Sequence, residues 1–252
     1  MEFDIWFWAL AMLAALFVGA SKGGLPMVGT LGVPIMALVM SPVMAAGLLL
    51  PIYIVSDVYG LWISRKFYDM RNIMIILPAA TVGLGIGWAT ASATSDDMVK
   101  LAVGLIGLAY CFDAILKSRR NLPPKPADIP RGAFWGTIAG FTSFVAHAGG
   151  PPYQMYVLPQ RMEKMVYAGT TTIIFSIVNL LKVPPYWYLG QINYGSLVTG
   201  LYLAPVAVFG AFLGYKLISN LPQKLFFRIV ETALFLVSLK LVYDGFVGLT
   251  NT

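Results

Sequence analysis

Stretches of about 20 predominantly apolar residues decide what this chain can fold into. A helix rises 1.5 Å per residue, so about 20 residues cross the roughly 30 Å hydrocarbon core of a bilayer. A β-barrel would instead show alternating segments of about ten residues. Only 11% of the 252 residues are charged, against about 25% in soluble domains. The sequence therefore predicts an all-α polytopic membrane protein, with long helices at 43–64, 72–93, 98–117, 165–187, 194–216 and 223–244.

Two further pairs of apolar runs are shorter, and each pair is interrupted by a glycine-rich segment. The first segment, Gly19–Pro26, separates residues 5–18 from residues 27–40 and carries Lys22. The second, 141–152, contains His147-Ala-Gly-Gly-Pro-Pro and separates residues 132–147 from residues 153–159. Runs of about 15 residues are short for a bilayer. They are predicted to form re-entrant or strongly tilted half-helices.

The order of elements repeats, which indicates an internal duplication. Each half has a broken or re-entrant helical hairpin followed by three long helices, and both halves share a Pro-x4-Gly-x3-Gly pattern. The predicted repeats are 5–117 and 132–245, joined by the basic linker 118–131 within a single membrane domain. The matched positions are Gly23-Gly24 with Gly149-Gly150, Ala46-Gly47 with Ala168-Gly169, Asp57 with Asn179, and Pro78, Gly83 and Gly87 with Pro205, Gly210 and Gly214.

The distribution of basic residues predicts that the two repeats have inverted topology. Cytoplasmic loops are enriched in lysine and arginine, so loops 65–71 and 117–131 are expected inside. The loop 94–97, with two aspartates and no base, is expected outside. Residues 43–64 then run inward and their counterpart 165–187 runs outward. Both termini are predicted to lie outside.

Inverted repeats with interrupted helices are typical of secondary transporters, whose sites lie near the midplane at the repeat interface. Irregular backbone within a bilayer must be buried in protein or line a water-filled cavity. A half-helix that begins after Gly24 or Gly150 would direct free N–H groups and its positive dipole end at that cavity, which favours an anion. Lys22 adds a full positive charge. The sequence thus predicts alternating access around an anion site where the two breaks meet.

These residues resemble the TauE/SafE sulfite exporter family over nearly the whole chain. The resemblance is carried by Gly23-Gly24-Leu25-Pro26 with Pro34, by Gly149-Gly150-Pro151, and by the Ala-Gly pairs at 46–47 and 168–169. Members usually show a longer Gly-x-Gly-Gly-Gly run, whose preceding places are taken here by Ser21-Lys22 and His147-Ala148. The resemblance implies export or exchange of sulfite, sulfonates or sulfoacetate-like anions across the bacterial inner membrane.

The predicted substrate contacts gather around the two breaks. Lys22 could bind the anion, or it could snorkel from a hairpin tip to the headgroups. His147 could bind the anion, carry a proton, or be a neutral core residue bonded to carbonyls. Asn179 could donate to substrate or form an interhelical hydrogen bond. The full predicted set is Ser21, Lys22, Gly23, Gly24, His147, Gly149, Gly150, Tyr153, Gln154 and Asn179.

Asp57 and His147 are the candidates for a coupling site. Asp57 could carry a coupling proton or serve as the counter-ion of Lys22. Lys182 and Lys240 are expected to approach the outer surface, and Asp113 and Glu231 the cytoplasmic one. All four are therefore interpreted as interfacial.

An anion channel is the main alternative, and a membrane-embedded enzyme is a weaker one. A channel would need a continuous polar path. The sequence contains no His-Glu-x-x-His or Gly-x-Ser-x-Gly motif, and one histidine cannot build a multi-histidine site. No enzymatic activity, metal or cofactor is therefore expected. The net charge is +6, and the basic residues collect in a few short loops. This distribution indicates how the chain is oriented in the membrane, and it does not indicate nucleic acid as a partner. The lipid bilayer is the expected environment, and a homodimer is left open.

Overall fold

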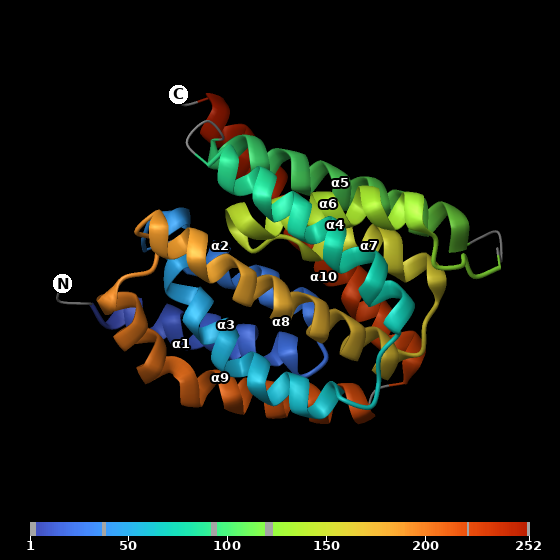
Figure 1. The fold of residues 1–252 in the computed structure, drawn as a ribbon, viewed down its shortest axis with the longest axis horizontal. Coiled ribbons are helices and arrows are strands. Elements are labelled where there is room, and N and C mark those ends of the chain that lie inside the picture. The colour runs from blue at the N-terminus through green and yellow to red at the C-terminus, as the bar shows by residue number, and fades with distance from the viewer. Residues whose placement is uncertain (1–3, 37–38, 92–94, 119–122, 221, 251–252) are drawn as a thin grey trace. The chain divides into compact units, whose positions relative to one another are not determined.

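The computed structural model describes residues 4–36, 39–91, 95–118, 123–220 and 222–250, and this part of the chain forms helices and no strands. Residues 119–122 of the predicted linker lie outside these ranges. The long helices confirm the predicted all-α membrane fold (Figure 1). Their bounds are α1 Ile5–Lys22, α3 Pro42–Ser64, α4 Met70–Ala89, α5 Asp96–Ser118, α6 Ile129–Ala146, α8 Lys164–Tyr188, α9 Tyr194–Asn220 and α10 Gln223–Thr250. The short ones are α2 Gly32–Met36, α7 Gly150–Val157 and the 3₁₀ helices η1 Pro26–Leu31 and η2 Leu158–Gln160.

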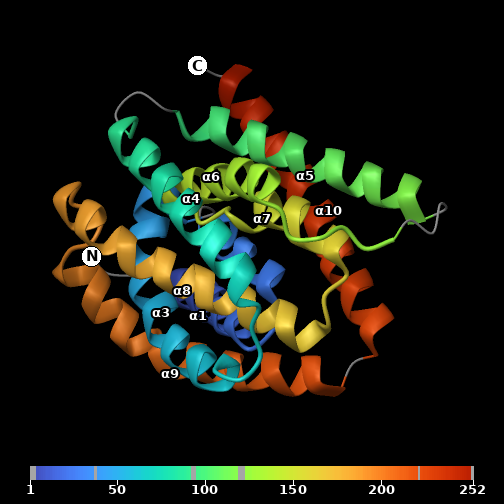
Figure 2. The same ribbon diagram turned by 45° about the vertical axis from the view of Figure 1, so that its right-hand side comes forward.

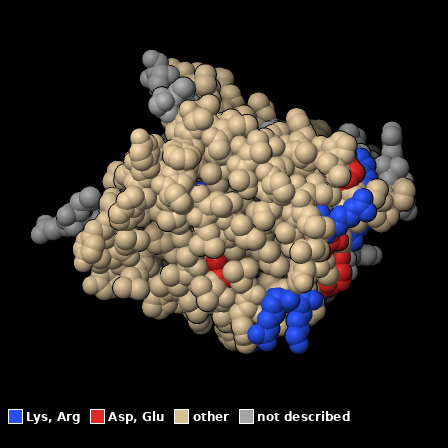
Figure 3. Space-filling view, viewed as in Figure 1, with Lys and Arg blue, Asp and Glu red and all other residues tan. Residues whose placement is uncertain are grey.

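Five of these helices are long and apolar enough to cross a membrane. Among the described residues, these helices are α1, α3, α4, α8 and α9. Few charged side chains interrupt the uncharged surface on the face in Figure 3. Both observations fit a chain whose solvent is largely lipid.

The two hairpins differ from the predicted pairs of half-helices. Residues Gly19–Lys22 continue α1, so the first break is confined to Gly23–Leu25. With 18 residues, α1 is about 27 Å long at 1.5 Å per residue. By contrast, α2 has five residues and α7 has eight. Each hairpin is therefore one long helix followed by short helical pieces.

Both breaks use backbone conformations that end a helix. Gly24 has φ 130°, which only glycine adopts readily. His147 is left-handed, with φ 51°. The N–H of His147 donates to the Ser143 carbonyl, and that of Ala148 donates to the Thr142 carbonyl. The bond from His147 to Ser143 is the αL cap that terminates helices, so the second break is the segment His147–Gly149.

The chain divides into two compact units, each assembled from both halves of the sequence. Unit 1 comprises residues 1–70 and 164–222, with α1, η1, α2, α3, α8 and α9. Unit 2 comprises residues 71–163 and 223–252, with α4 to α7, η2 and α10. Figures 1 and 2 both show α1, α3, α8 and α9 running alongside one another within unit 1.

In unit 1, glycines bring α1 and α9 into backbone contact. A Cβ added at Gly19 would overlap the carbonyl oxygen of Ala207, and one at Gly210 would overlap that of Leu16. Gly23 and Gly214 are equally close to the facing backbone. Small residues at such a seam let two helices approach closely within a membrane.

Unit 2 contains the same kind of seam between α4 and α6. A Cβ at Gly83 would overlap the Thr137 carbonyl oxygen, and one at Gly140 would overlap that of Ala80. The glycines of the Pro-x4-Gly-x3-Gly pattern have the same packing role in α4 and α9. In α4 they pack against α6, the first helix of the second half, and in α9 they pack against α1, the first helix of the first half. Their inverted orientation stays a prediction.

Candidate functional site

Lys22 and Asp57 form a buried ion pair in unit 1. Lys22 Nζ lies 2.8 Å from Asp57 Oδ1, and the two side chains are 5% and 6% exposed. Lys22 is the last residue of α1, and Asp57 lies in the C-terminal half of α3. Lys22 therefore does not snorkel to a surface. The prediction that Asp57 is its counter-ion is confirmed as a contact.

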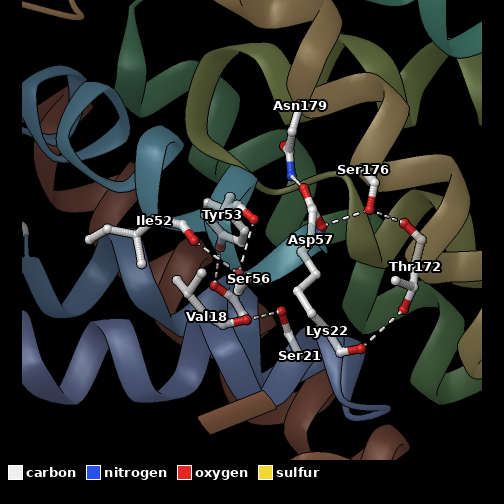
Figure 4. Close-up of polar contacts among 11 residues, drawn as sticks. Val18, Ser21, Lys22, Ile52, Tyr53, Ser56, Asp57, Thr172, Ser176 and Asn179 are labelled. Carbon is white, nitrogen blue, oxygen red and sulfur yellow. Dashed lines mark hydrogen bonds and ion pairs between the residues drawn. The ribbon is translucent and has the colours of Figure 1, made fainter. Parts of the chain in front are cut away.

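Two side chains of α8 complete the surroundings of the Asp57 carboxylate (Figure 4). Asn179 Nδ2 donates to Oδ2 at 3.0 Å, which confirms the interhelical hydrogen bond predicted for Asn179. Ser176 Oγ lies 2.7 Å from Oδ1 and also 2.7 Å from the Thr172 carbonyl oxygen. Its single proton can serve either acceptor. The carboxylate is thus surrounded by an ammonium, an amide and a hydroxyl.

The aromatic ring of Tyr53 and the first break lie on the other side of Lys22. The ammonium is 5.3 Å from the ring centroid, within range of a cation–π interaction. Tyr53 Oη donates to the Gly29 carbonyl at 2.7 Å and so ties η1 to α3. Ser21 Oγ donates to the Val18 carbonyl at 2.6 Å, and Gly29 packs directly against the Ser21 side chain. Ser21 therefore packs the break and is not among the residues that line the pocket described next.

A hollow of about 250 Å³, part of it open, lies beside the first break. Lys22, Gly23 and Gly24 form one wall. The remaining lining comes from three other segments of unit 1, namely the end of α3 and the loop after it, the start of α8, and the end of α9. Those residues are Ile63, Ser64, Phe67, Met165, Ala168, Gly169, Thr172 and Tyr215. The predicted contacts Lys22, Gly23 and Gly24 thus share one pocket.

Gly60 of α3 packs closely against Lys22 and Thr172. A Cβ at Gly60 would lie 2.9 Å from the Lys22 carbonyl oxygen and 2.9 Å from Thr172 Cγ2. Thr172 Oγ1 is also 3.5 Å from that carbonyl oxygen. The polar positions 172, 176 and 179 of α8 follow one another at spacings of four and three, which places them on one helix face. This face leads from the pocket wall to the buried carboxylate.

The predicted contacts of the second break lie in unit 2. His147, Gly149 and Gly150 are buried there, as are Tyr153 and Gln154 of α7. Because Pro151 and Pro152 have no N–H, the first turn of α7 offers fewer donors than an ordinary helix start. The expected anion attraction by free amides is correspondingly weaker at this break. The two predicted sets belong to different units, and their meeting at the midplane stays a prediction.

Lys182 is the residue that sequence reasoning placed wrongly. It was predicted to approach the outer surface, but its side chain has no exposed area. Lys182 lies three residues after Asn179 on α8 and interacts electrostatically with both Lys22 and Asp57. Ser176 was missed altogether. The signal was present in the sequence, because polar residues at 172, 176, 179 and 182 recur at helical spacing in an apolar helix.

The family model described as "Sulfite exporter TauE/SafE" matches residues 9–241. The chain therefore belongs to this family, whose members are membrane transporters of sulfur anions and not enzymes. A search of curated proteins found no match, and neither did a search of solved structures.

Proposed function

We propose that this member of the TauE/SafE family is a secondary transporter that exports sulfite or an organosulfonate by alternating access. The anion would bind in the pocket of unit 1. The observation that carries the proposal is the lining of that pocket by Lys22, the basic partner of a buried ion pair, together with Gly23 and Gly24. An ionisable residue buried in a membrane helix is expensive and usually functional.

The positive charge for the anion would come from a side chain rather than from a helix terminus. The C-terminus of α1 lies at Gly23, and helix C-termini carry partial negative charge. The ammonium of Lys22 has three donors. Asp57 holds it in place, and an anion in the pocket could share it with Asp57. Gly23 and Gly24 lack side chains, so the anion could approach the backbone closely.

The dimensions of the pocket favour a small substrate. The hollow of about 250 Å³ includes open solvent, and its enclosed part has room for about one water-sized group. Sulfite and short sulfonates are compact anions of few heavy atoms.

The charged residues near the pocket favour loading from the cytoplasm. The pocket lies where α3 and α9 end and α8 begins, and Arg65, Lys66, Lys164 and Lys216 stand at these helix ends. Under the positive-inside rule these ends face the cytoplasm. The substrate would then enter from inside, as export across the bacterial inner membrane requires, and both termini would lie outside.

The bodies that move would be the compact units rather than the two sequence halves. The seams α1–α9 and α4–α6 each join helices of different halves through backbone contact. The chain passes between the units at residues 70–71, 163–164 and 222–223. The substrate contacts of His147, Gly149, Gly150, Tyr153 and Gln154 stay a prediction. His147 and Asp57 stay the coupling candidates, and a homodimer stays a prediction.

Uptake into proteoliposomes tests the proposal with radiolabelled sulfite and sulfoacetate, and with acetate for comparison. Lys22→Gln alone would leave Asp57 buried without its cation, so the double variant Lys22→Gln/Asp57→Asn is the sharper test. This variant keeps a polar, hydrogen-bonding side chain at each position and removes both charges. Lys240→Gln, in an exposed pair with Asp244, is the matched control.

The double variant should lose at least about tenfold in sulfite uptake, since a charge-assisted contact contributes about 1.5–3 kcal/mol. The control should transport at the wild-type rate. Stimulation of uptake by sulfite inside the vesicles would identify a carrier rather than a channel. Wild-type uptake by the double variant would refute the role of Lys22.

A further inference from the structure

Gln154 of α7 carries a side-chain amide that has no hydrogen-bond partner in the part of the chain that the structure describes. The residue is fully buried, and both Nε2 and Oε1 are unpaired. α7 packs against α5, α6 and η2, so this amide belongs to unit 2. Unpaired buried donors and acceptors are costly, and native proteins satisfy nearly all of them. The amide of Gln154 is therefore expected to meet a small polar partner from outside the chain.

Two backbone donors at the start of α7 are unpaired as well. Gly149 and Gly150 are buried, and among the described residues neither N–H donates to a backbone carbonyl. Pro151 and Pro152 follow them and have no N–H. The Tyr153 N–H already donates to the Gly149 carbonyl at 3.2 Å. The start of this eight-residue helix thus offers two free N–H groups instead of the usual four.

The side chain of Gln154 is placed to supply the missing donors. Gln154 stands four residues after Gly150, which puts both on one face of α7. Helical side chains lean toward the N-terminus of their helix, so the amide is directed back over the turn that the prolines leave short of donors. Its two N–H groups join those of the two glycines. Together they form one set of uncharged donors at the second break.

This set of donors also contains an acceptor, and no fixed charge is buried around it. Among the residues of unit 2 whose burial is described, no lysine, arginine, aspartate or glutamate is buried. Desolvation disfavours charge in such surroundings, and a dianion would lose more hydration than a monoanion. Oε1 of Gln154 lies beside Nε2 in the planar amide and accepts a hydrogen bond. A ligand that presents both an acceptor oxygen and an O–H satisfies both atoms.

We propose that Gly149, Gly150 and Gln154 form a second anion site, built from uncharged donors in unit 2, which accepts a singly protonated oxyanion such as hydrogensulfite. Hydrogensulfite can present an O–H, whereas methanesulfonate has a methyl group in that place and offers acceptors alone. Both carry one negative charge, so the neighbouring His147 attracts them alike. The inference rests on the proposed function, since it names the form in which a sulfur oxyanion binds. None of these residues lines the pocket of unit 1.

Calorimetry on purified protein in nanodiscs tests this site, with hydrogensulfite and methanesulfonate as the probes. Both titrations use one mildly acidic buffer, in which sulfite carries a proton. The starting protein is Lys22→Gln/Asp57→Asn, which removes the buried ion pair beside the pocket of unit 1. Gln154→Met is added to it, because methionine fills a similar volume without an amide. Gln160→Met is the matched control, since the amide of Gln160 is already paired with that of Asn72.

The starting protein should bind hydrogensulfite more tightly than methanesulfonate. Gln154→Met should lower the hydrogensulfite affinity about 10- to 100-fold, the contribution of one charge-assisted hydrogen bond, and should remove the preference. Gln160→Met should leave both affinities unchanged and lower the unfolding temperature, because it leaves the amide of Asn72 unpaired. Gln154→Met should not lower that temperature, since the polar atoms it removes have no partner in the protein.

Three results would overturn the inference, and they differ in what else they refute. Unchanged hydrogensulfite affinity in Gln154→Met means that the amide holds water only, and the proposed function stands. Binding by wild type but not by the starting protein assigns all binding to unit 1. If neither protein binds sulfite, the proposed function falls as well. If Gln154→Met is not monodisperse, Gln154→Asn decides, because it withdraws the amide by one methylene: a lost preference for hydrogensulfite supports the site, and a retained one refutes it.

Discussion

Two glycines of α4, separated by one residue, provide a controlled test of the helix seam in unit 2. A Cβ at Gly83 would overlap the Thr137 carbonyl oxygen and lie 2.8 Å from the Phe141 amide nitrogen. A Cβ at Gly85 would meet nothing within 4 Å. Gly83→Ala and Gly85→Ala are therefore the same chemical change, in the same helix, on opposite faces.

The difference between the two variants can be estimated from these contacts. Alanine is favoured over glycine in a helix interior by about 1 kcal/mol, so Gly85→Ala should be neutral or stabilising by up to that amount. At Gly83 the same gain is opposed by overpacking, which costs about 1–3 kcal/mol. The obstructing atom is a backbone carbonyl that cannot rotate away, so the upper value applies. The net expectation for Gly83→Ala is about 2 kcal/mol of destabilisation.

Thermal unfolding in detergent, followed by the loss of monodisperse protein, measures the effect. About 2–4 °C per kcal/mol is typical at this size, so Gly83→Ala should lower the apparent unfolding temperature by about 4–8 °C. Gly85→Ala should leave it unchanged or raise it slightly. Equal shifts in the two variants, or a Gly83→Ala protein as stable as wild type, would refute the seam.

Two further hydrogen-bonded contacts give predictions of the same kind. Tyr53→Phe removes the bond to the Gly29 carbonyl and should cost about 0.5–1.5 kcal/mol; a thermal shift no larger than that of Tyr243→Phe, at an exposed tyrosine, would contradict it. The side-chain amides of Asn72 and Gln160 bond reciprocally at 3.0 Å. A double-mutant cycle with alanine at both positions should give a coupling of about 0.5–3 kcal/mol, and additive effects would show that the pair contributes nothing.

Much of the fold could be predicted because its signals are local. The six long helices predicted begin within two residues of the predicted bounds and end within six, since hydrophobic length is read directly from the sequence. The extent of the first break was not predicted correctly. Gly19, Ala20 and Ser21 read as a flexible segment, but they continue α1 because Gly19 packs against the α9 backbone. Tertiary contact overrode the weak helix propensity of glycine.

Some residues of the candidate site could likewise be recognised from the sequence, and others could not. Lys22, Asp57 and Asn179 were recognised because polar residues are rare in membrane helices and therefore conspicuous. Lys182 was misplaced because its position near the end of an apolar helix resembles that of an interfacial lysine. Whether such a side chain reaches headgroups or turns inward depends on which helix faces it.

The sequence by itself determined the membrane class, the family, the two glycine breaks and the helices on which the charges lie. These follow from apolar length, from motif and from spacing along one chain. Tertiary structure chose the counter-ion role among those that the sequence left open for Asp57, and it alone decided that α8 supplies Ser176 and Asn179 to this carboxylate and that Lys182 is buried. The reason is physical: helices from both halves of the chain pack into each compact unit, and no local pattern specifies which faces of separate helices come together.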